Sequence, residues 1–128
     1  AANPQRVQEM LWANPRVVFF REDASLGPEQ GPRGAQGVPL TPLRSVAVDA
    51  ASVPYGTPLW IDTTEPLSAL PLRRLVMAQD TGSAIVGAVR IDFFWGSGDS
   101  ALEQAGRMRQ PLRKWALWPR AVAVPAAP

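Results

Sequence analysis

The stretch "AQDTGSAIVGAVRIDFFWGSG", residues 78–98, contains two aspartates, Asp80 and Asp92, that each follow a short apolar run. Aspartate is disfavoured inside strands and gathers where strands end, because its side chain bonds nearby backbone amides. The stretch therefore predicts two short strands, "RLVMAQ" (74–79) and "AVRI" (88–91), that both end at an aspartate. The glycines between them predict a turn-rich connection.

Short runs of the same kind recur at intervals of roughly ten residues along the rest of the chain. This spacing favours an antiparallel-rich barrel or sandwich. Fourteen prolines and ten glycines also support short strands joined by turns. The further predicted strands are "RVVFF" (16–20), "SVAV" (45–48), "TPLWID" (57–62) and "KWALW" (114–118), and the predicted helices cover residues 4–12 and 98–106.

The amino-acid composition limits the chemistry open to the chain. Its 128 residues suffice for one domain, and 46% apolar residues predict a packed core. There is no histidine and no cysteine, which excludes Ser-His-Asp and Cys-His nucleophiles and zinc sites built on those ligands. We therefore expect no metal and no cofactor, and any acid–base catalysis should depend on carboxylates.

Several segments outside the predicted strands carry signals of their own. Residues 22–37 are rich in Gly and Pro and predict a long functional or mobile loop. No apolar run approaches the roughly 18 residues of a membrane span. The start at Ala1, without methionine, predicts a processed product or a piece of a longer protein. A basic cluster suits either an anionic partner or a solvated rim, and it comprises Arg107, Arg109, Arg113, Lys114 and Arg120.

Three aspartates at predicted strand ends are the candidate catalytic groups, although each also fits the simpler role of a turn-maker. Asp49 precedes a polar turn and fits that role well. Asp80 leads into residues 81–84, "TGSA", whose backbone can approach a ligand or a strand closely. Asp92 lies between "AVRI" and "FFW", where desolvation would raise its pKa above about 3.9 and suit it to general acid catalysis. A nearby Asp80 carboxylate would raise that pKa further.

The tryptophans suggest a substrate class. Most of them should be core residues, but a tryptophan beside an acid also forms a stacking floor for a sugar ring. Pairs of carboxylates are the usual equipment for cutting glycosidic bonds. The residues alone leave open whether Asp80 and Asp92 face one cleft. The tryptophans concerned are Trp60, Trp95, Trp115 and Trp118.

Five segments together identify a family. They are "NPRVVFF" (14–20), "GAQGVPLTPLRSVAVD" (34–49), "VPYGTPLW" (53–60), "AQDTGSAIVGAVRIDFFWGSG" (78–98) and "AGRMRQP" (105–111). They occur in the order seen in the membrane-bound lytic transglycosylase A family, so the chain resembles the C-terminal part of that family, from about residue 4 to 120. Ser83 stands where glycine is common in the family, which is a mild departure.

The resemblance implies a fold and a reaction. The fold is mainly β, a double-psi β-barrel called the three-aspartate domain, with short helices. The reaction is cleavage of the β-1,4 bond between N-acetylmuramic acid and N-acetylglucosamine in peptidoglycan, without water and with a 1,6-anhydro product. One carboxyl serves both proton transfers. The implied catalytic residues are Asp92, as acid/base, and Asp80, and the implied substrate-binding or supporting residues are Asp49, Thr81, Gly82, Ser83, Ala84, Arg90 and Trp95.

The same resemblance sets expectations for organisation and location. The predicted parts are an N-terminal helix and lead-in (1–13), the three-aspartate domain (14–120) and a loose tail (121–128). The family's enzymes are larger, so the barrel is expected to be incomplete in this chain and to be completed by an N-terminal portion or a second copy. The expected partner is peptidoglycan glycan, not nucleic acid, in the periplasm or cell envelope, with the parent anchored to the outer membrane. The alternative is a non-catalytic peptidoglycan-binding or cell-wall assembly module.

Overall fold

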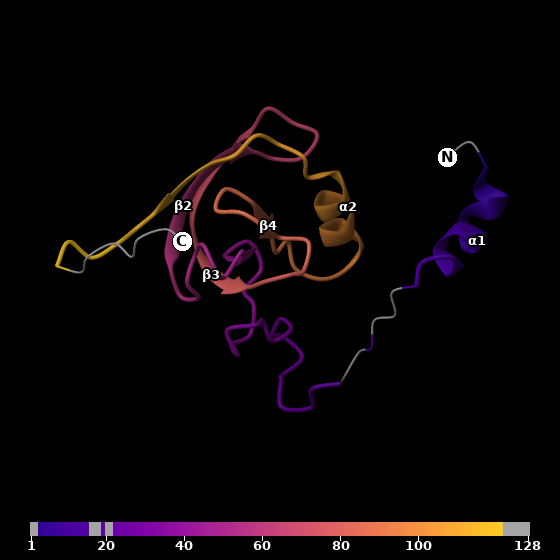
Figure 1. Ribbon diagram of the computed structural model, residues 1–128, viewed down its shortest axis with the longest axis horizontal. Coiled ribbons are helices and arrows are strands. Elements are labelled where there is room, and N and C mark those ends of the chain that lie inside the picture. Colours follow the sequence, from indigo (N-terminus) through magenta and orange to yellow (C-terminus); the bar gives the residue numbers. More distant parts are fainter. Residues whose placement is uncertain (1–2, 16–18, 20–21, 122–128) are drawn as a thin grey trace.

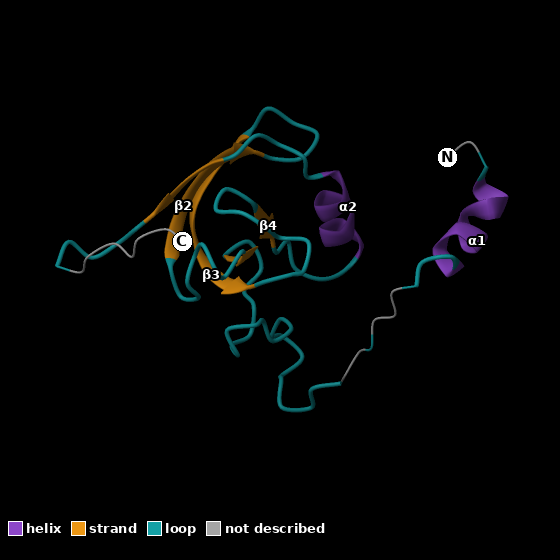
Figure 2. Cartoon of the chain, viewed as in Figure 1, coloured by secondary structure: helices purple, strands orange, loops and turns teal. Residues whose placement is uncertain are grey.

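The computed structural model describes residues 3–15, 19 and 22–121, and these residues form one five-stranded sheet with short helices (Figures 1 and 2). The strand order is β4-β1-β3-β2-β5. The strands are β1 (Ser45–Val48), β2 (Pro58–Thr64), β3 (Pro71–Asp80), β4 (Ile91–Phe93) and β5 (Arg113–Ala116). The helices are the 3-10 turn η1 (Pro4–Arg6), α1 (Val7–Trp12) and α2 (Asp99–Arg107).

The sheet is mixed and curls around β4. The central strands β1 and β3 run parallel, whereas β1–β4, β2–β3 and β2–β5 are antiparallel pairs. Among the described residues the edge strands β4 and β5 do not pair with each other, so the curled sheet stays open (Figure 1). The predicted fold class, mainly β with short helices, is therefore confirmed as a half-barrel.

Side chains of one sheet face form the core. In β2 the residues Leu59 and Ile61 are buried while Trp60 between them is exposed, which is the alternation expected of a sheet with one packed face. Val46 and Val48 of β1 are fully buried against them. Ile91 and Phe93 of β4 pack on the same cluster. The packed face is thus the concave side of the half-barrel, and it fixes which residues each strand turns outward.

The two helices relate to the sheet in different ways. Helix α2 begins after Gly98 and lies on the open side of the half-barrel (Figure 1). The N-terminal helix predicted over residues 4–12 is confirmed as η1 followed by α1. No residue of α1 is buried, and Trp12 at its end is 77% exposed. Helix α1 therefore contributes nothing to the core of the described residues.

Two predicted strands need comment. The strand predicted over "AVRI" (88–91) is wrong, because the strand observed is Ile91–Phe93 and Asp92 lies in its middle. The reason is that Ile91 and Phe93 both face the core, so the alternating triplet forms the strand. "RVVFF" (16–20) falls outside the described residues except Phe19, which is 90% exposed. The tail from residue 122 also lies outside them.

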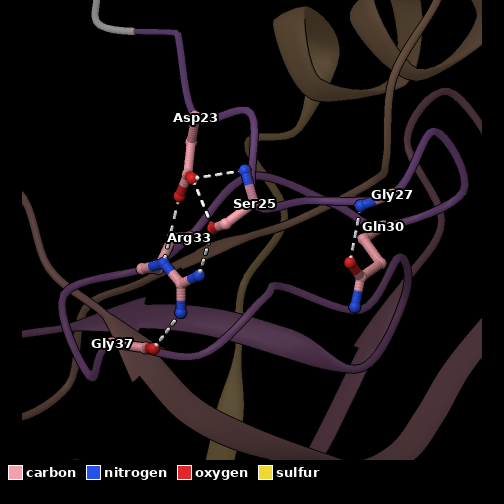
Figure 3. Close-up of polar contacts among 6 residues, drawn as sticks. All are labelled: Asp23, Ser25, Gly27, Gln30, Arg33 and Gly37. Carbon is pink, nitrogen blue, oxygen red and sulfur yellow. Dashed lines mark hydrogen bonds and ion pairs between the residues drawn. The ribbon is translucent and has the colours of Figure 1, made fainter.

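The long Gly- and Pro-rich loop is held together by its own polar groups (Figure 3). The Arg33 guanidinium donates to Asp23 Oδ2 at 3.2 Å, to Ser25 Oγ at 3.2 Å and to the Gly37 carbonyl at 2.7 Å. Hydrogen bonds from the Ser25 hydroxyl and amide, and from Arg33, lower the pKa of Asp23. The loop predicted over residues 22–37 is confirmed, and Arg33 is its organising side chain.

Truncating the core should cost stability in proportion to burial. Leu59→Ala removes a side chain with 0% exposure from the centre of the sheet, and it should lower the free energy of unfolding by about 2–5 kcal/mol. The matched control is Leu102→Ala on α2, where the leucine is 73% exposed, and it should change stability by at most about 0.5 kcal/mol. Urea unfolding followed by circular dichroism measures both. Equal effects of the two changes would contradict this core.

Candidate active site

A cavity of about 580 Å³ lies on the open side of the half-barrel. It is bounded by β4, by the end of β2 and by the connection between α2 and β5. Asp92 is the one carboxylate among its described lining residues, and it is accompanied by two arginines and a tryptophan. The lining is Ile61, Thr63, Arg90, Ile91, Asp92, Phe93, Trp95, Ala105, Met108, Arg109, Gln110 and Leu112.

Asp92 is more open to solvent than its apolar neighbours in sequence suggest. It sits opposite Ala47 of β1, between Ile91 and Phe93, which turn toward the core. Alternation along the strand turns the Asp92 side chain away from these two neighbours to the cavity wall, where it is 54% exposed and accepts a hydrogen bond from Arg90 Nε at 3.3 Å. The predicted desolvation of Asp92 by "AVRI" and "FFW" is therefore wrong.

Asp80 lies in the same row of the sheet but two strands away. It pairs with Ala47 from the β3 side, while Asp92 pairs with Ala47 from the β4 side. Two strand spacings amount to about 9.5 Å between the backbones. Asp80 Oδ1 accepts the Ala35 amide at 2.9 Å, and Asp80 does not line the Asp92 cavity. Asp80 therefore lies outside the cavity and holds the loop at residues 34–36.

Asp49 directs the loop between β3 and β4. Its Oδ2 accepts the Gly87 amide at 2.7 Å and its Oδ1 accepts the Ala51 amide at 3.0 Å. These bonds, that of Gly87 first, lower the pKa of Asp49. Gly87 has φ +96°, a left-handed conformation that favours glycine and aims its N–H at the carboxylate. Asp49 therefore fixes the chain three residues before Arg90.

The small residues after Asp80 fold into an anchored turn. Thr81 Oγ1 donates to the Val48 carbonyl at 2.7 Å, and the Ile85 amide donates to the Gly82 carbonyl at 2.9 Å. Ile85 is buried, whereas Ser83 and Ala84 are exposed. None of residues 81–84 lines the Asp92 cavity. The structure thus joins Arg90, Asp92 and Trp95 at one cavity and places Asp49, Asp80 and residues 81–84 outside its lining.

Trp95 presents an unused donor beside the same cavity. Its ring meets Phe93 edge to face, with 4.9 Å between centroids and an interplanar angle of 64°. Its Nε1 is buried and has no hydrogen-bond partner among the described residues. A buried unpaired donor is costly, and this N–H is not accessible from the cavity. Trp95 therefore contributes to the cavity wall by packing.

Sequence reasoning missed three polar lining residues. Thr63 donates from Oγ1 to the Pro111 carbonyl at 2.8 Å, and Gln110 Nε2 donates to the Glu65 carbonyl at 3.2 Å. These bonds hold the connection after α2 against β2 and carry Arg109 to the cavity wall. Arg109 was noticed only as part of a basic cluster. The segment "AGRMRQP" was the available signal, because it belongs to the family motifs.

Lys114 is another buried polar group without a partner, as are Arg74 Nε and Trp118 Nε1 among the described residues. It faces Ile61 across the β2–β5 pair, and its buried Nζ has no hydrogen-bond partner among the described residues. Burial lowers the pKa of Lys114, and the charge of Asp49 opposes this shift. Within the described part of the chain, no three carboxylates are grouped to hold a metal ion. No described helix is long and apolar enough to cross a membrane.

The five-stranded sheet and its aspartates correspond to a known family of protein domains. A family model described as "3D domain" matches residues 44–118, which include all five strands and the candidate residues Asp49, Asp80 and Asp92. The chain belongs to the 3D domain family. It is also similar to membrane-bound lytic murein transglycosylase A of Vibrio cholerae, with 35% identity over 118 residues. That alignment covers 87% of this chain and 30% of the relative, so the chain spans less than a third of the protein it matches.

Solved structures agree with this assignment. The chain is similar to the lytic transglycosylase LtgG of Burkholderia pseudomallei, with 57% identity, a TM-score of 0.71, and coverage of 93% of this chain and 35% of that one. It is also similar to E. coli MltA with bound chitohexaose, with 32% identity, a TM-score of 0.73, and coverage of 88% and 34%. The predicted resemblance and the predicted double-psi barrel fold class are thereby confirmed.

The contact between the Gly-rich loop and β3 can be tested at Gly34. A Cβ there would collide with the Gln79 carbonyl oxygen and lie 2.6 Å from Leu40 Cδ2. Gly34→Ala should therefore destabilise the chain by about 1–3 kcal/mol and speed hydrogen exchange at the Ala35 amide. Gly106→Ala, in open space on α2, is the control and should be neutral or stabilising. Unchanged exchange at Ala35 would refute the role given to Asp80.

The Asp49 contacts make stability depend on pH. Because its folded-state pKa is lowered, they stabilise the fold fully above the unfolded pKa of about 3.9 and lose effect as pH falls through the folded value. Asp49→Asn should therefore cost stability near neutral pH, and the gap to wild type should shrink in acid. Urea unfolding at about pH 7 and about pH 3 measures this gap. A gap of the same size at both values would contradict the prediction.

Proposed function

We propose that this chain is the C-terminal catalytic segment of a peptidoglycan lytic transglycosylase that cleaves the N-acetylmuramic acid–β-1,4–N-acetylglucosamine bond without water. The observation that carries the proposal is that the Asp92 cavity contains a single carboxylate among its described lining residues. Hydrolases that hold a water or form a glycosyl-enzyme use two carboxylates at the scissile bond. One carboxylate at one cavity suits a reaction in which the sugar supplies its own nucleophile.

The proposed mechanism uses Asp92 twice. Protonated Asp92 first gives its proton to the glycosidic oxygen as the C1–O bond breaks, which releases the N-acetylglucosamine hydroxyl. The C6 hydroxyl of the muramic acid then attacks C1, and the Asp92 carboxylate takes the proton of that hydroxyl. A 1,6-anhydro ring forms, no water is consumed, and Asp92 ends protonated for the next cycle.

The residues around Asp92 have supporting roles in this proposal. Arg90, whose Nε lies 3.3 Å from Asp92 Oδ1, orients the carboxylate. Asp49 acts on the same element through Gly87, and Asp80 secures the adjoining loop through Ala35. Trp95 offers its ring to the bound glycan. Residues 81–84 are proposed to line the glycan's path from the neighbouring turn, although they lie outside the cavity.

Asp92 is half exposed, so the closed environment that a general acid needs must come from elsewhere. We propose that an N-terminal portion of the same protein, or else a second copy, covers the open side of the half-barrel and forms the other wall of a glycan groove. The relatives, of which this chain matches about a third or less, have the length for such a portion. The proposed setting is the periplasmic side of the cell envelope, on peptidoglycan.

The E. coli relative with bound chitohexaose supports a glycan ligand for this fold. The runner-up is a non-catalytic peptidoglycan-binding or assembly module, which the exposed, Arg-paired state of Asp92 favours. The two proposals differ in one product. Only the transglycosylase leaves muropeptides with an anhydro end, lighter by one water than the hydrolysed form.

Replacing the proposed acid/base should abolish that product. Asp92→Asn in the longest natural form of the protein should lower anhydromuropeptide formation by about 10²–10⁴-fold, because the amide cannot exchange the proton. Mass spectrometry of digested peptidoglycan measures it. Asp99→Asn at the start of α2 is the matched control and should leave the product at wild-type levels. Anhydro products that persist unchanged after Asp92→Asn would sink the assignment.

A further inference from the structure

The outer face of the sheet carries an exposed aromatic pair that the proposed reaction does not use. Trp60 of β2 and Trp115 of β5 lie directly opposite each other in the antiparallel pair, and Leu75 of β3 lies opposite Trp60 on its other side. Their exposed fractions are 41%, 47% and 41%. Side chains opposite each other stand about 5 Å apart, so the three form a continuous apolar strip across three strands.

A row of charges runs beside this strip, two residues further along each strand. Asp62 lies between Arg73 and Arg113, accepting from Arg73 Nε at 2.9 Å and from Arg113 NH2 at 2.6 Å. Asp62 is only 16% exposed, whereas Arg73 and Arg113 are 58% and 71% exposed. The shielded carboxylate therefore holds both guanidinium groups in place, and their remaining N–H groups face solvent. The row as a whole has one net positive charge.

The apolar strip and the row of charges are in contact, and the charged row lines a hollow. The Arg113 guanidinium lies 5.9 Å from the centre of the Trp115 ring, within the range of a cation–π contact. A cavity of about 370 Å³ is lined by Asp62, Arg73 and Arg113 together with residues of β2, β3 and the lead-in to β5. Neither the Trp60–Trp115 pair nor these three charged residues line the Asp92 cavity. The hollow adjoins the Asp92 cavity at Thr63 and Leu112, but its charged lining residues differ from those of that cavity.

We propose that this outer face, formed by Trp60, Trp115, Arg73, Asp62 and Arg113, is a second glycan-binding surface that takes a carboxylate-bearing polysaccharide. A sugar ring packs its C–H face on the tryptophan pair, and a carboxylate of the same polymer binds the exposed N–H groups of Arg73 and Arg113 on the solvent side of Asp62. The identity of the polymer as peptidoglycan rests on the proposed function. The surface itself rests on the arrangement of these five side chains.

The pattern favours a glycan over a protein partner. An interface between protein chains has an apolar centre depleted in charge and needs about 1,200 Å² or more of buried surface. Here a narrow aromatic strip lies directly beside a fixed row of charges, so apolar and ionic contacts alternate over the length of one or two sugars. Such a surface would hold an insoluble strand close to the Asp92 cavity and raise its effective concentration there.

The decisive experiment is co-sedimentation with purified peptidoglycan sacculi. The longest natural form of the protein is used with Asp92→Asn, so that the polymer is not digested. Adding Trp60→Ala and Trp115→Ala should weaken retention about tenfold, equivalent to roughly 1.4 kcal/mol. Trp12→Ala, at a tryptophan that is 77% exposed on α1, is the matched control and should retain full binding. Retention unchanged in the double variant would overturn the proposal.

A second arm keeps the test decisive if the double variant folds poorly. Arg113→Gln removes the charge, and it should weaken retention severalfold and flatten its dependence on salt. Arg107→Gln on α2, which breaks the pair with Glu103, is its control. Sedimentation velocity must show the same oligomeric state throughout, since a dimer lost with Trp60→Ala would mean that the face binds a second copy. Loss of anhydro products in Asp92→Asn is scored separately, so either proposal can fail alone.

Discussion

The arrangement of the site depends on one short strand, β1, being packed between β3 and β4. Ser45, Val46 and Val48 are fully buried, so the strand has a single register in which Ala47 faces outward. The pairing with β3 shifts between Val46 and Ala47, and this bulge brings Asp80 opposite Ala47. Ser45 stabilises the same point, because its hydroxyl donates to Gln79 Oε1 at 2.6 Å and accepts the Thr41 amide at 2.8 Å. Because Asp80 and Asp92 both pair with Ala47, β1 determines where the two aspartates lie relative to each other.

The central strands were predictable because their apolar and branched residues are typical of buried strands. "SVAV", "TPLWID" and "RLVMAQ" each place branched or apolar side chains on a face that must be covered, and β1, β2 and β3 contain these stretches except for Thr57, which precedes β2. The strand at Asp92 was misplaced for the opposite reason. It is an edge strand with one packed face, so the alternation of Ile91, Asp92 and Phe93 counted for more than the apolar run before it.

The site was only partly predictable, since cavities arise from contacts between distant segments. The family resemblance nominated Asp92, Arg90 and Trp95, which do line one cavity, but no motif marks Thr63, and Gln110 is marked only as part of "AGRMRQP". Their bonds to Pro111 and Glu65 join residues more than forty positions apart. The position of Asp80 was equally inaccessible, because it depends on strand order and on a bulge. Apolar neighbours in sequence are a poor guide to desolvation in a strand, where they point to the opposite face.

Three features of the described residues leave groups unpaired or apolar side chains exposed. The edge strands β4 and β5 each leave one side unpaired, and unpaired edges invite a further strand. Lys114 turns a buried ammonium without a hydrogen-bond partner into the concave side, where an incoming carboxylate would satisfy it. Helix α1 exposes Met10, Leu11 and Trp12 together. A portion of protein covering the open side would pair with the edge strands and give Lys114 a partner. It would also shield Asp92 from water, which is the one property that the proposed acid/base lacks in the half-barrel.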